Sequence, residues 1–178
     1  MTLRPLTFDD VDTLVALDRD PEVMRYISGG RPTPREQVVE TVRRSMGCRW
    51  MASKRAPSEL STSEPTTAFV GWFGLVPSSE AQYEVGYRLH RDAWGKGLAT
   101  EGTRTLIDVA FAELGATRVW AQTMAVNLRS RAVMERCGLR YVRTFHLEWD
   151  DPIEGGEVEY ELSRAGWERR ASTGSDPA

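Results

Sequence analysis

A glycine-flanked loop, between an alternating segment and a helical pattern, is the stretch best suited to chemistry. Gly95 and Gly97 flank Lys96, and the helical pattern that follows continues to Gly115. The first turn of a helix has N–H groups without intrahelical partners, and the helix dipole adds partial positive charge there. Because glycine lets the backbone approach a ligand closely, this loop could bind a phosphate or pyrophosphate. A purely structural turn fits the same pattern.

Two familiar nucleotide-binding loops do not match this stretch. Its spacing differs from the G-x-x-x-x-G-K-S/T of triphosphate-binding P-loops. Thr100 stands where the dinucleotide fingerprint G-x-G-x-x-G needs its third glycine. We therefore expect a phosphate-bearing ligand of another kind.

The second informative stretch runs from Asn127 to Leu139 and reads NLRSRAVMERCGL. Asn127 stands where a strand pattern gives way to a helix, which makes it a good N-cap. Ser130 falls one turn into that helix, where it is either an ordinary polar residue or part of a site.

The elements that position these residues follow from hydrophobic periodicity. Residues 84–89 alternate as a strand does, with Val85, Tyr87 and Leu89 on one face. Further strands are expected at residues 3–6, 50–54, 67–76, 118–123, 141–149 and 158–162, and helices within 7–24, 33–46, 98–114 and 127–137. A Pro-Ser-Ser turn is expected after Val76, and a long hairpin at the end. This order predicts an α/β or α+β sheet protein of one domain.

Composition narrows the functional classes. The chain has 178 residues and a net charge of −3, so it has no basic surplus for binding nucleic acid. Two cysteines and two histidines are too few for a disulfide framework or a histidine-rich metal centre. We see no signal peptide or membrane span and expect a cytoplasmic protein. Residues 1–167 are expected to form the domain and 168–178 a disordered tail.

Together the two stretches resemble the GNAT-type N-acetyltransferases, particularly their RimJ/RimL-like branch. The resemblance rests on WGKGLATE followed by N-x-x-S and C-G-L, with Trp94 in the first position of the family's Q/R-x-x-G-x-G/A loop. It implies a mixed, mostly antiparallel twisted sheet of about seven strands with a V-shaped split, flanked by about four helices. It also implies acetyl-coenzyme A as co-substrate, no metal, and a homodimer.

The resemblance assigns the coenzyme to the split. Backbone amides of residues 95–100 would hold the pyrophosphate, the strand end at Leu89 would pair with the pantetheine arm, and Asn127 would bond that arm. Arg131 could neutralise phosphates, as could Lys96 and Arg129. The expected coenzyme-binding residues are Leu89, Trp94, Gly95, Lys96, Gly97, Leu98, Ala99, Thr100, Asn127 and Arg131.

Catalysis would join the acetyl group to a primary amine, of a protein N-terminus or a small molecule, by direct attack. Many family members use a tyrosine acid where this chain has Met134, which cannot donate a proton. Ser130 matches the serine of RimL-like enzymes, and we expect it to assist thiolate departure. For the base we rank Glu84 first and Glu148 second, with His146 third. A non-catalytic acyl-coenzyme A sensor on the same fold is the alternative.

Overall fold

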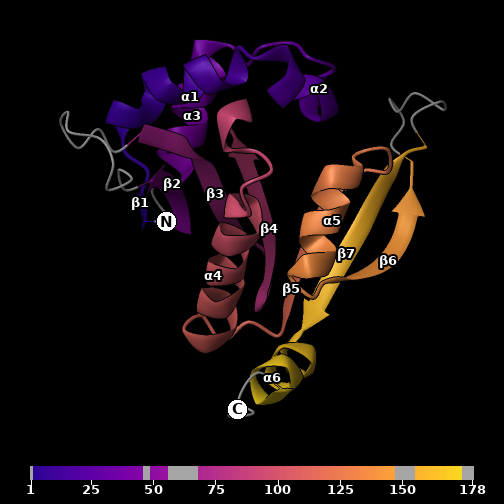
Figure 1. Ribbon diagram of the computed structural model, residues 1–178. Helices are drawn as coiled ribbons and strands as arrows, with labels where there is room; N and C mark the ends of the chain where they lie inside the picture. Colours follow the sequence, from indigo (N-terminus) through magenta and orange to yellow (C-terminus); the bar gives the residue numbers. More distant parts are fainter. Residues whose placement is uncertain (1, 46–48, 56–67, 147–154, 174–178) are drawn as a thin grey trace.

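The protein is built on one seven-stranded sheet in the order β1-β2-β3-β4-β5-β7-β6 (Figure 1). A computed structural model describes residues 2–45, 49–55, 68–146 and 155–173. The strands are β1 (Thr2–Pro5), β2 (Arg49–Arg55), β3 (Ala68–Ser79), β4 (Gln82–Leu89), β5 (Arg118–Met124), β6 (Arg140–Phe145) and β7 (Glu157–Ser163). Only the β4–β5 pair is parallel among these strands. The predicted mixed, mostly antiparallel sheet is confirmed.

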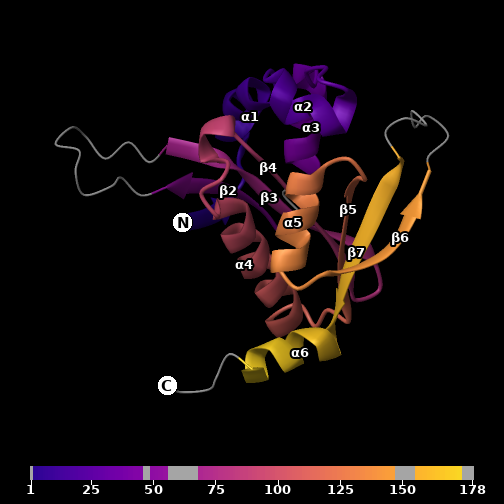
Figure 2. The same cartoon turned by 45° about the vertical axis from the view of Figure 1, so that its right-hand side comes forward.

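Six α-helices accompany the sheet in the described part of the chain, where about four were expected. They are α1 (Val11–Asp18), α2 (Pro21–Ser28), α3 (Arg35–Ser45), α4 (Leu98–Ala112), α5 (Leu128–Arg136) and α6 (Arg164–Thr173), with 3₁₀ turns η1 (Phe8–Asp10) and η2 (Arg91–Ala93). Figures 1 and 2 place α1–α3 at one end of the molecule and α6 at the other. None of the described helices is long and apolar enough to cross a membrane.

The helix expected within residues 7–24 is divided because the chain carries a second helix start. Asp20 caps α2: its Oδ1 accepts a hydrogen bond from the backbone N–H of Glu22 at 3.0 Å. Pro21 occupies the first turn, where its missing N–H costs nothing. The capping box predicted for Thr7 and Asp10 is present, and it begins η1.

Neighbouring residues of β3 separate two hydrophobic clusters. Phe73 is fully buried in a cluster with residues of α4, whereas Trp72 packs against the cluster formed by α1 and α3. Because successive strand residues point to opposite faces, α4 covers one face of the sheet and α1 and α3 cover the other. Val85 and Leu89 of β4 are buried on the α4 face, as the alternation predicted.

The sheet divides in its middle. The parallel ladder pairs Gln82–Glu84 with Arg118–Trp120. Beyond these three pairs β4 stays with β3 as far as Leu89, and β5 stays with β7 as far as Met124. The two central strands therefore diverge toward the ends from which α4 and α5 follow, which gives the V-shaped split.

The turn predicted after Val76 is wrong. Pro77–Ser79 continue β3 instead of forming a turn, because Pro77 pairs with Tyr83 and Ser79 with Gln82. The turn falls instead at Glu80 and Ala81, and Ala81 adopts a positive φ of 54°.

The tail is also partly ordered, since α6 extends to Thr173 and disorder from Glu168 is wrong for residues 168–173. Trp167 explains the helix: its ring stacks on Phe111 with centroids 5.4 Å apart, and its Nε1 donates to Asp108 Oδ1 at 2.7 Å. Arg170 donates to the carbonyl of Cys137.

Candidate active site

The glycine loop presents an open backbone at the start of α4. Gly95 and Gly97 have φ values of 71° and 77°, in the left-handed region that favours glycine. A Cβ built on either residue would meet no atom within 4 Å. Gly97 is the N-cap of α4, and its carbonyl accepts the N–H of Glu101 at 3.0 Å. The amides before Glu101 thus begin a 15-residue helix beside open space, which is the geometry an anion requires.

Trp94 ties this loop to the end of the central strand. Its indole Nε1 donates to the carbonyl of Leu89 at 3.0 Å. The guanidinium of Arg129, on the first turn of α5, lies 5.3 Å from the centroid of the Trp94 ring. The indole therefore contacts both sides of the split.

Asn127 is the N-cap of α5, as predicted. Its Oδ1 accepts the backbone N–H of Ser130 at 3.2 Å, and its Nδ2 donates to Thr123 Oγ1 at 3.0 Å. The amide thereby joins the end of β5 to the start of α5. A primary amide has two donor hydrogens and two acceptor lone pairs, so one of each has no partner among the residues that the structure describes.

A tyrosine lies beside the serine that was singled out in the sequence. Tyr87 Oη donates to Ser130 Oγ at 3.3 Å, across 43 positions of the chain. Burial raises the pKa of Tyr87 to about 12, so the phenol is neutral at physiological pH. Met134 is buried in the main core. The alternation of apolar residues could place Tyr87 only on one face of a strand. Its pairing with Ser130 depends on how α5 packs, which the sequence pattern does not give.

Glu84 occupies the last paired position before β4 and β5 diverge. Its side chain is half-buried, and burial raises the pKa of its carboxyl above the ordinary value. A carboxylate with a raised pKa is a stronger base than an exposed one. Glu148 lies outside the described residues, and His146 is exposed just after β6.

A family model described as the acetyltransferase (GNAT) domain matches residues 1–140. The chain belongs to the GNAT acetyltransferase family. The FsC-acetyl coenzyme A-N(2)-transacetylase of Aspergillus fumigatus is 36% identical over 181 residues, covering 95% of this chain and 76% of that protein. The protein YkkB of Bacillus subtilis is 31% identical over 160 residues, covering 85% and 87%.

Solved GNAT structures share the fold. An acetyltransferase from Bacillus anthracis aligns with a TM-score of 0.74 and 22% identity, over 92% of this chain and 94% of its own. The spermidine N-acetyltransferase of Vibrio cholerae, solved in complex with CoA and spermine, aligns with a TM-score of 0.74 and 15% identity, over 93% and 96%. At these identities the likeness concerns the fold alone.

In this GNAT chain Arg131 is turned toward the sheet. Its Nε donates to Tyr160 Oη at 3.2 Å and its Nη1 to the carbonyl of Ala125 at 3.0 Å. These contacts hold α5 onto the strands beneath it. Arg129, two positions earlier, lies over Trp94 and is the arginine of this turn that reaches the loop.

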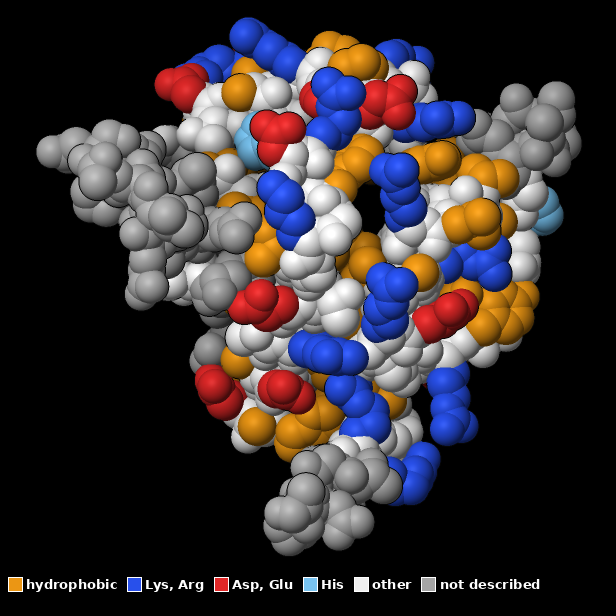
Figure 3. Space-filling view, in the orientation of Figure 1, with side chains coloured by type: hydrophobic (Ala, Val, Ile, Leu, Met, Phe, Trp, Pro, Cys, Tyr) orange, Lys and Arg blue, Asp and Glu red, His pale blue; other side chains and the backbone are white. Residues whose placement is uncertain are grey.

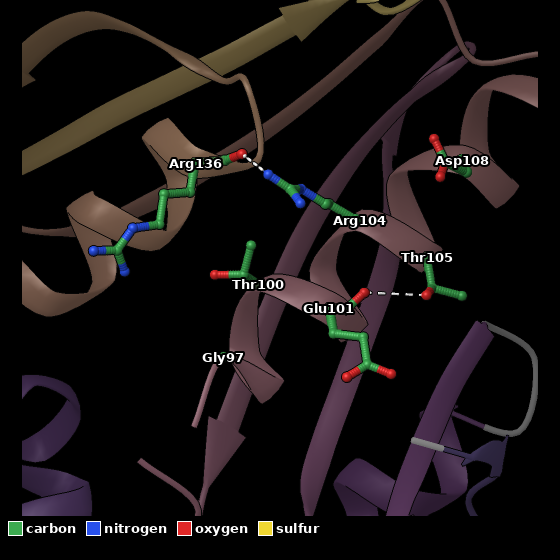
Figure 4. Close-up of a pocket in the computed structure, with 7 residues that line it drawn as sticks. All are labelled: Gly97, Thr100, Glu101, Arg104, Thr105, Asp108 and Arg136. Carbon is green, nitrogen blue, oxygen red and sulfur yellow. Dashed lines mark hydrogen bonds between the residues drawn. The ribbon is translucent and has the colours of Figure 1, made fainter. Parts of the chain in front are cut away.

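An open pocket of about 570 Å³ adjoins the loop on the outer side of α4. It begins at Gly97 and is lined also by Thr100, Glu101, Arg104, Thr105, Asp108 and Arg136 (Figure 4). Arg104 Nη2 donates to the carbonyl of Arg136 at 2.6 Å, which links α4 to α5. Figure 3 shows basic side chains along this face and a gap in the surface between the α4 loop and the start of α5. Among the described residues no group of three or more His, Cys, Asp or Glu could hold a metal ion.

Proposed function

We propose that this GNAT chain transfers an acetyl group from acetyl-coenzyme A to a primary amine by direct attack in a ternary complex. The observation that carries the proposal is the split between β4 and β5, which has the glycine loop on one side and Asn127 with Ser130 on the other. Trp94 and Ser130 also favour the RimJ/RimL-like branch.

The described residues fit the coenzyme. The open backbone of residues 95–100 would hold the pyrophosphate, since a side chain at Gly95 or Gly97 would fill the space it needs. The free donor and acceptor of Asn127, with the strand end at Leu89, would bind the pantetheine arm. Lys96, exposed in the loop, would neutralise phosphate charge. Arg131 would act indirectly, by fixing α5.

The chain's own groups would divide the chemistry between them. Bound acetyl-coenzyme A supplies the thioester. Glu84 would take a proton from the amine, which otherwise titrates near pH 10. Ser130 would stabilise the departing sulfur by donating its hydroxyl hydrogen. Glu148 and His146 remain the alternative bases.

The acceptor is proposed to be a small molecule with an exposed amine, or a protein N-terminus. The name of the Aspergillus relative specifies transacetylation at an N(2) position, which supports a nitrogen acceptor.

A melting experiment with four ligands tests the coenzyme assignment. Acetyl-coenzyme A, coenzyme A, ATP and NAD are each added at about 1 mM, where a site with a Kd of about 10 μM adds about 2.7 kcal/mol to the free energy of unfolding. We expect a shift with both coenzyme A species and none with ATP or NAD. An amine screen by thiol release then follows: binding without turnover of any amine would support the sensor instead, and no shift at all would overturn the proposal.

A further inference from the structure

The Tyr87–Ser130 hydrogen bond joins the two sides of the split. Tyr87 belongs to β4, and its ring lies 6.0 Å from that of Phe73 in the core. Ser130 belongs to the first turn of α5, and its backbone N–H is held by Asn127. Both side chains are half-buried. Their hydroxyl groups therefore meet at the place where the two central strands have separated.

We propose that Tyr87 is a positioning residue for Ser130: its hydroxyl donates to Ser130 Oγ and leaves the serine hydrogen free to point at the departing sulfur. This inference rests on the proposed function. In the described part of the chain, no acceptor takes the hydrogen of Ser130. A donor with one unused hydrogen, beside a split that would hold a thioester, is suited to stabilising a thiolate.

The pKa values of Tyr87 and of the thiol decide whether Tyr87 supplies a proton or only a hydrogen bond. Burial raises the pKa of Tyr87 to about 12, whereas a thiol titrates near 8.5. Tyr87 is therefore too weak an acid to protonate the thiolate, and it contributes a hydrogen bond. A hydrogen bond from Tyr87 polarises Ser130, so that the hydroxyl of Ser130 becomes a stronger donor in turn.

The step balances without a further reactant. The amine nitrogen forms a bond to the carbonyl carbon, the carbon–sulfur bond breaks, and its electron pair stays on sulfur, where Ser130 donates a hydrogen bond. The proton lost by nitrogen goes to Glu84 and then to solvent. The thiolate takes a proton from solvent after it leaves.

Tyr87→Phe tests the inference, and Tyr83→Phe is its matched control. Tyr83 lies on the same strand, is half-buried against the same core, and has no hydroxyl partner among the described residues. We expect Tyr87→Phe to lower kcat about twofold to tenfold, as for a lost hydrogen bond between neutral groups. The KM for acetyl-coenzyme A should be unchanged, and Tyr83→Phe should behave as the wild type.

Combining Tyr87→Phe with Ser130→Ala should cost no more than Ser130→Ala alone, because both changes remove one donor chain. Independent losses that multiply in the double variant would overturn the positioning role. Equal kcat values for Tyr87→Phe and Tyr83→Phe, in proteins with the same melting temperature, would also overturn it.

Coenzyme binding provides a readout that does not depend on turnover. Calorimetry would measure the affinities for coenzyme A and for desulfo-coenzyme A at pH 7 and at pH 9.5. If the pair stabilises a thiolate, the affinity for coenzyme A should rise between these pH values, whereas the affinity for desulfo-coenzyme A should not. Tyr87→Phe should remove this difference. If the protein acetylates no amine but shows this pH effect, the proposed function is contradicted and thiolate stabilisation by Tyr87 and Ser130 is supported. If the protein is active but shows no pH effect, thiolate stabilisation by the two residues is contradicted.

Discussion

Glu84 of β4 pairs with Trp120 of β5 at the last position of the parallel ladder. Strand pairing thus fixes the backbone of Glu84, and the split opens from the next position of β4. Burial raises the pKa of the Glu84 carboxyl, which means that the folded protein holds this carboxylate at a free-energy cost. Such a cost is common where a side chain is kept for chemistry.

Replacing Glu84 with Gln should separate stability from activity. Since the folded-state pKa is raised, the stabilising contribution of Glu84 is present below about pH 4.3 and is lost as pH rises through the folded pKa. We therefore expect Glu84→Gln to melt higher than the wild type at pH 8, and the difference to vanish toward pH 4. The kcat should fall about 10²- to 10⁴-fold, as for a lost general base.

Glu80→Gln is the control for this experiment, because Glu80 is exposed in the β3–β4 turn. It should change neither the melting temperature nor the turnover. If Glu84→Gln keeps its turnover, the base must be sought at Glu148 or His146.

Gly97→Ala should weaken coenzyme binding more than it affects folding. Alanine at a positive φ costs about 1–2 kcal/mol, and its methyl group would enter the space beside the α4 amides. Gly115 has a φ of 66° and equally open surroundings, but it follows the other end of α4. Gly97→Ala and Gly115→Ala should lose similar stability in urea titrations, and only Gly97→Ala should bind coenzyme A more weakly by calorimetry. Equal coenzyme affinities of the two variants would argue against pyrophosphate binding by the glycine loop.

Trp94→Phe should loosen the loop. It keeps a ring under Arg129 but removes the hydrogen bond to Leu89, worth about 1 kcal/mol or about fivefold in Kd. Trp167→Phe removes a comparable bond to Asp108, where α6 meets the second half of α4. We expect the Kd for coenzyme A to rise in Trp94→Phe and to stay at the wild-type value in Trp167→Phe. A rise in both would indicate a general loss of packing.

Glu159 should carry part of the acid sensitivity of folding. Burial alone would raise its pKa, but hydrogen bonds from Arg143 and Arg118 outweigh burial and hold the pKa below its usual value. The stability it contributes is thus present above about pH 4.3 and is lost as pH falls through the lowered folded value. Glu159→Gln should cost about 1–3 kcal/mol at pH 7 in urea unfolding, and less at acid pH.

Glu161→Gln serves as the comparison. Glu161 also accepts from Arg118, at 2.6 Å, but 41% of its side chain is exposed. Its replacement should cost well under 1 kcal/mol. Equal losses for the two variants would show that burial does not decide the value of these ion pairs.

Local signals predicted the elements that frame the split. The alternation of Val85 and Leu89, and the N-cap at Asn127, depend on nearest neighbours in the chain and are confirmed. The signal for α2 was also local, Asp20 followed by Pro21, but it was merged into the preceding helical face. The turn at Ala81 carries no glycine, although its φ is positive, so composition could not indicate it.

Contacts between distant segments could not be predicted. Tyr87 reaches Ser130 only because the first turn of α5 lies across the split from β4, and nothing local marks either residue for the other. The polar composition from Glu168 onward suggested disorder, but Trp167 supplies the stacking and the hydrogen bond that fix α6 to α4. Arg131 is a predicted phosphate-binding residue, and only the folded chain shows its hydrogen bonds to Tyr160 and to the carbonyl of Ala125.

Lys96 is exposed between the two glycines of the loop. Lysines occur only at positions 54 and 96, so the surface offers very few amines to a reactive ester. Label uptake at Lys96, counted by mass spectrometry, would register whether an anion covers the loop. Labelling of Lys96 thus reports whether the loop is occupied, without an introduced dye and without knowledge of the acceptor.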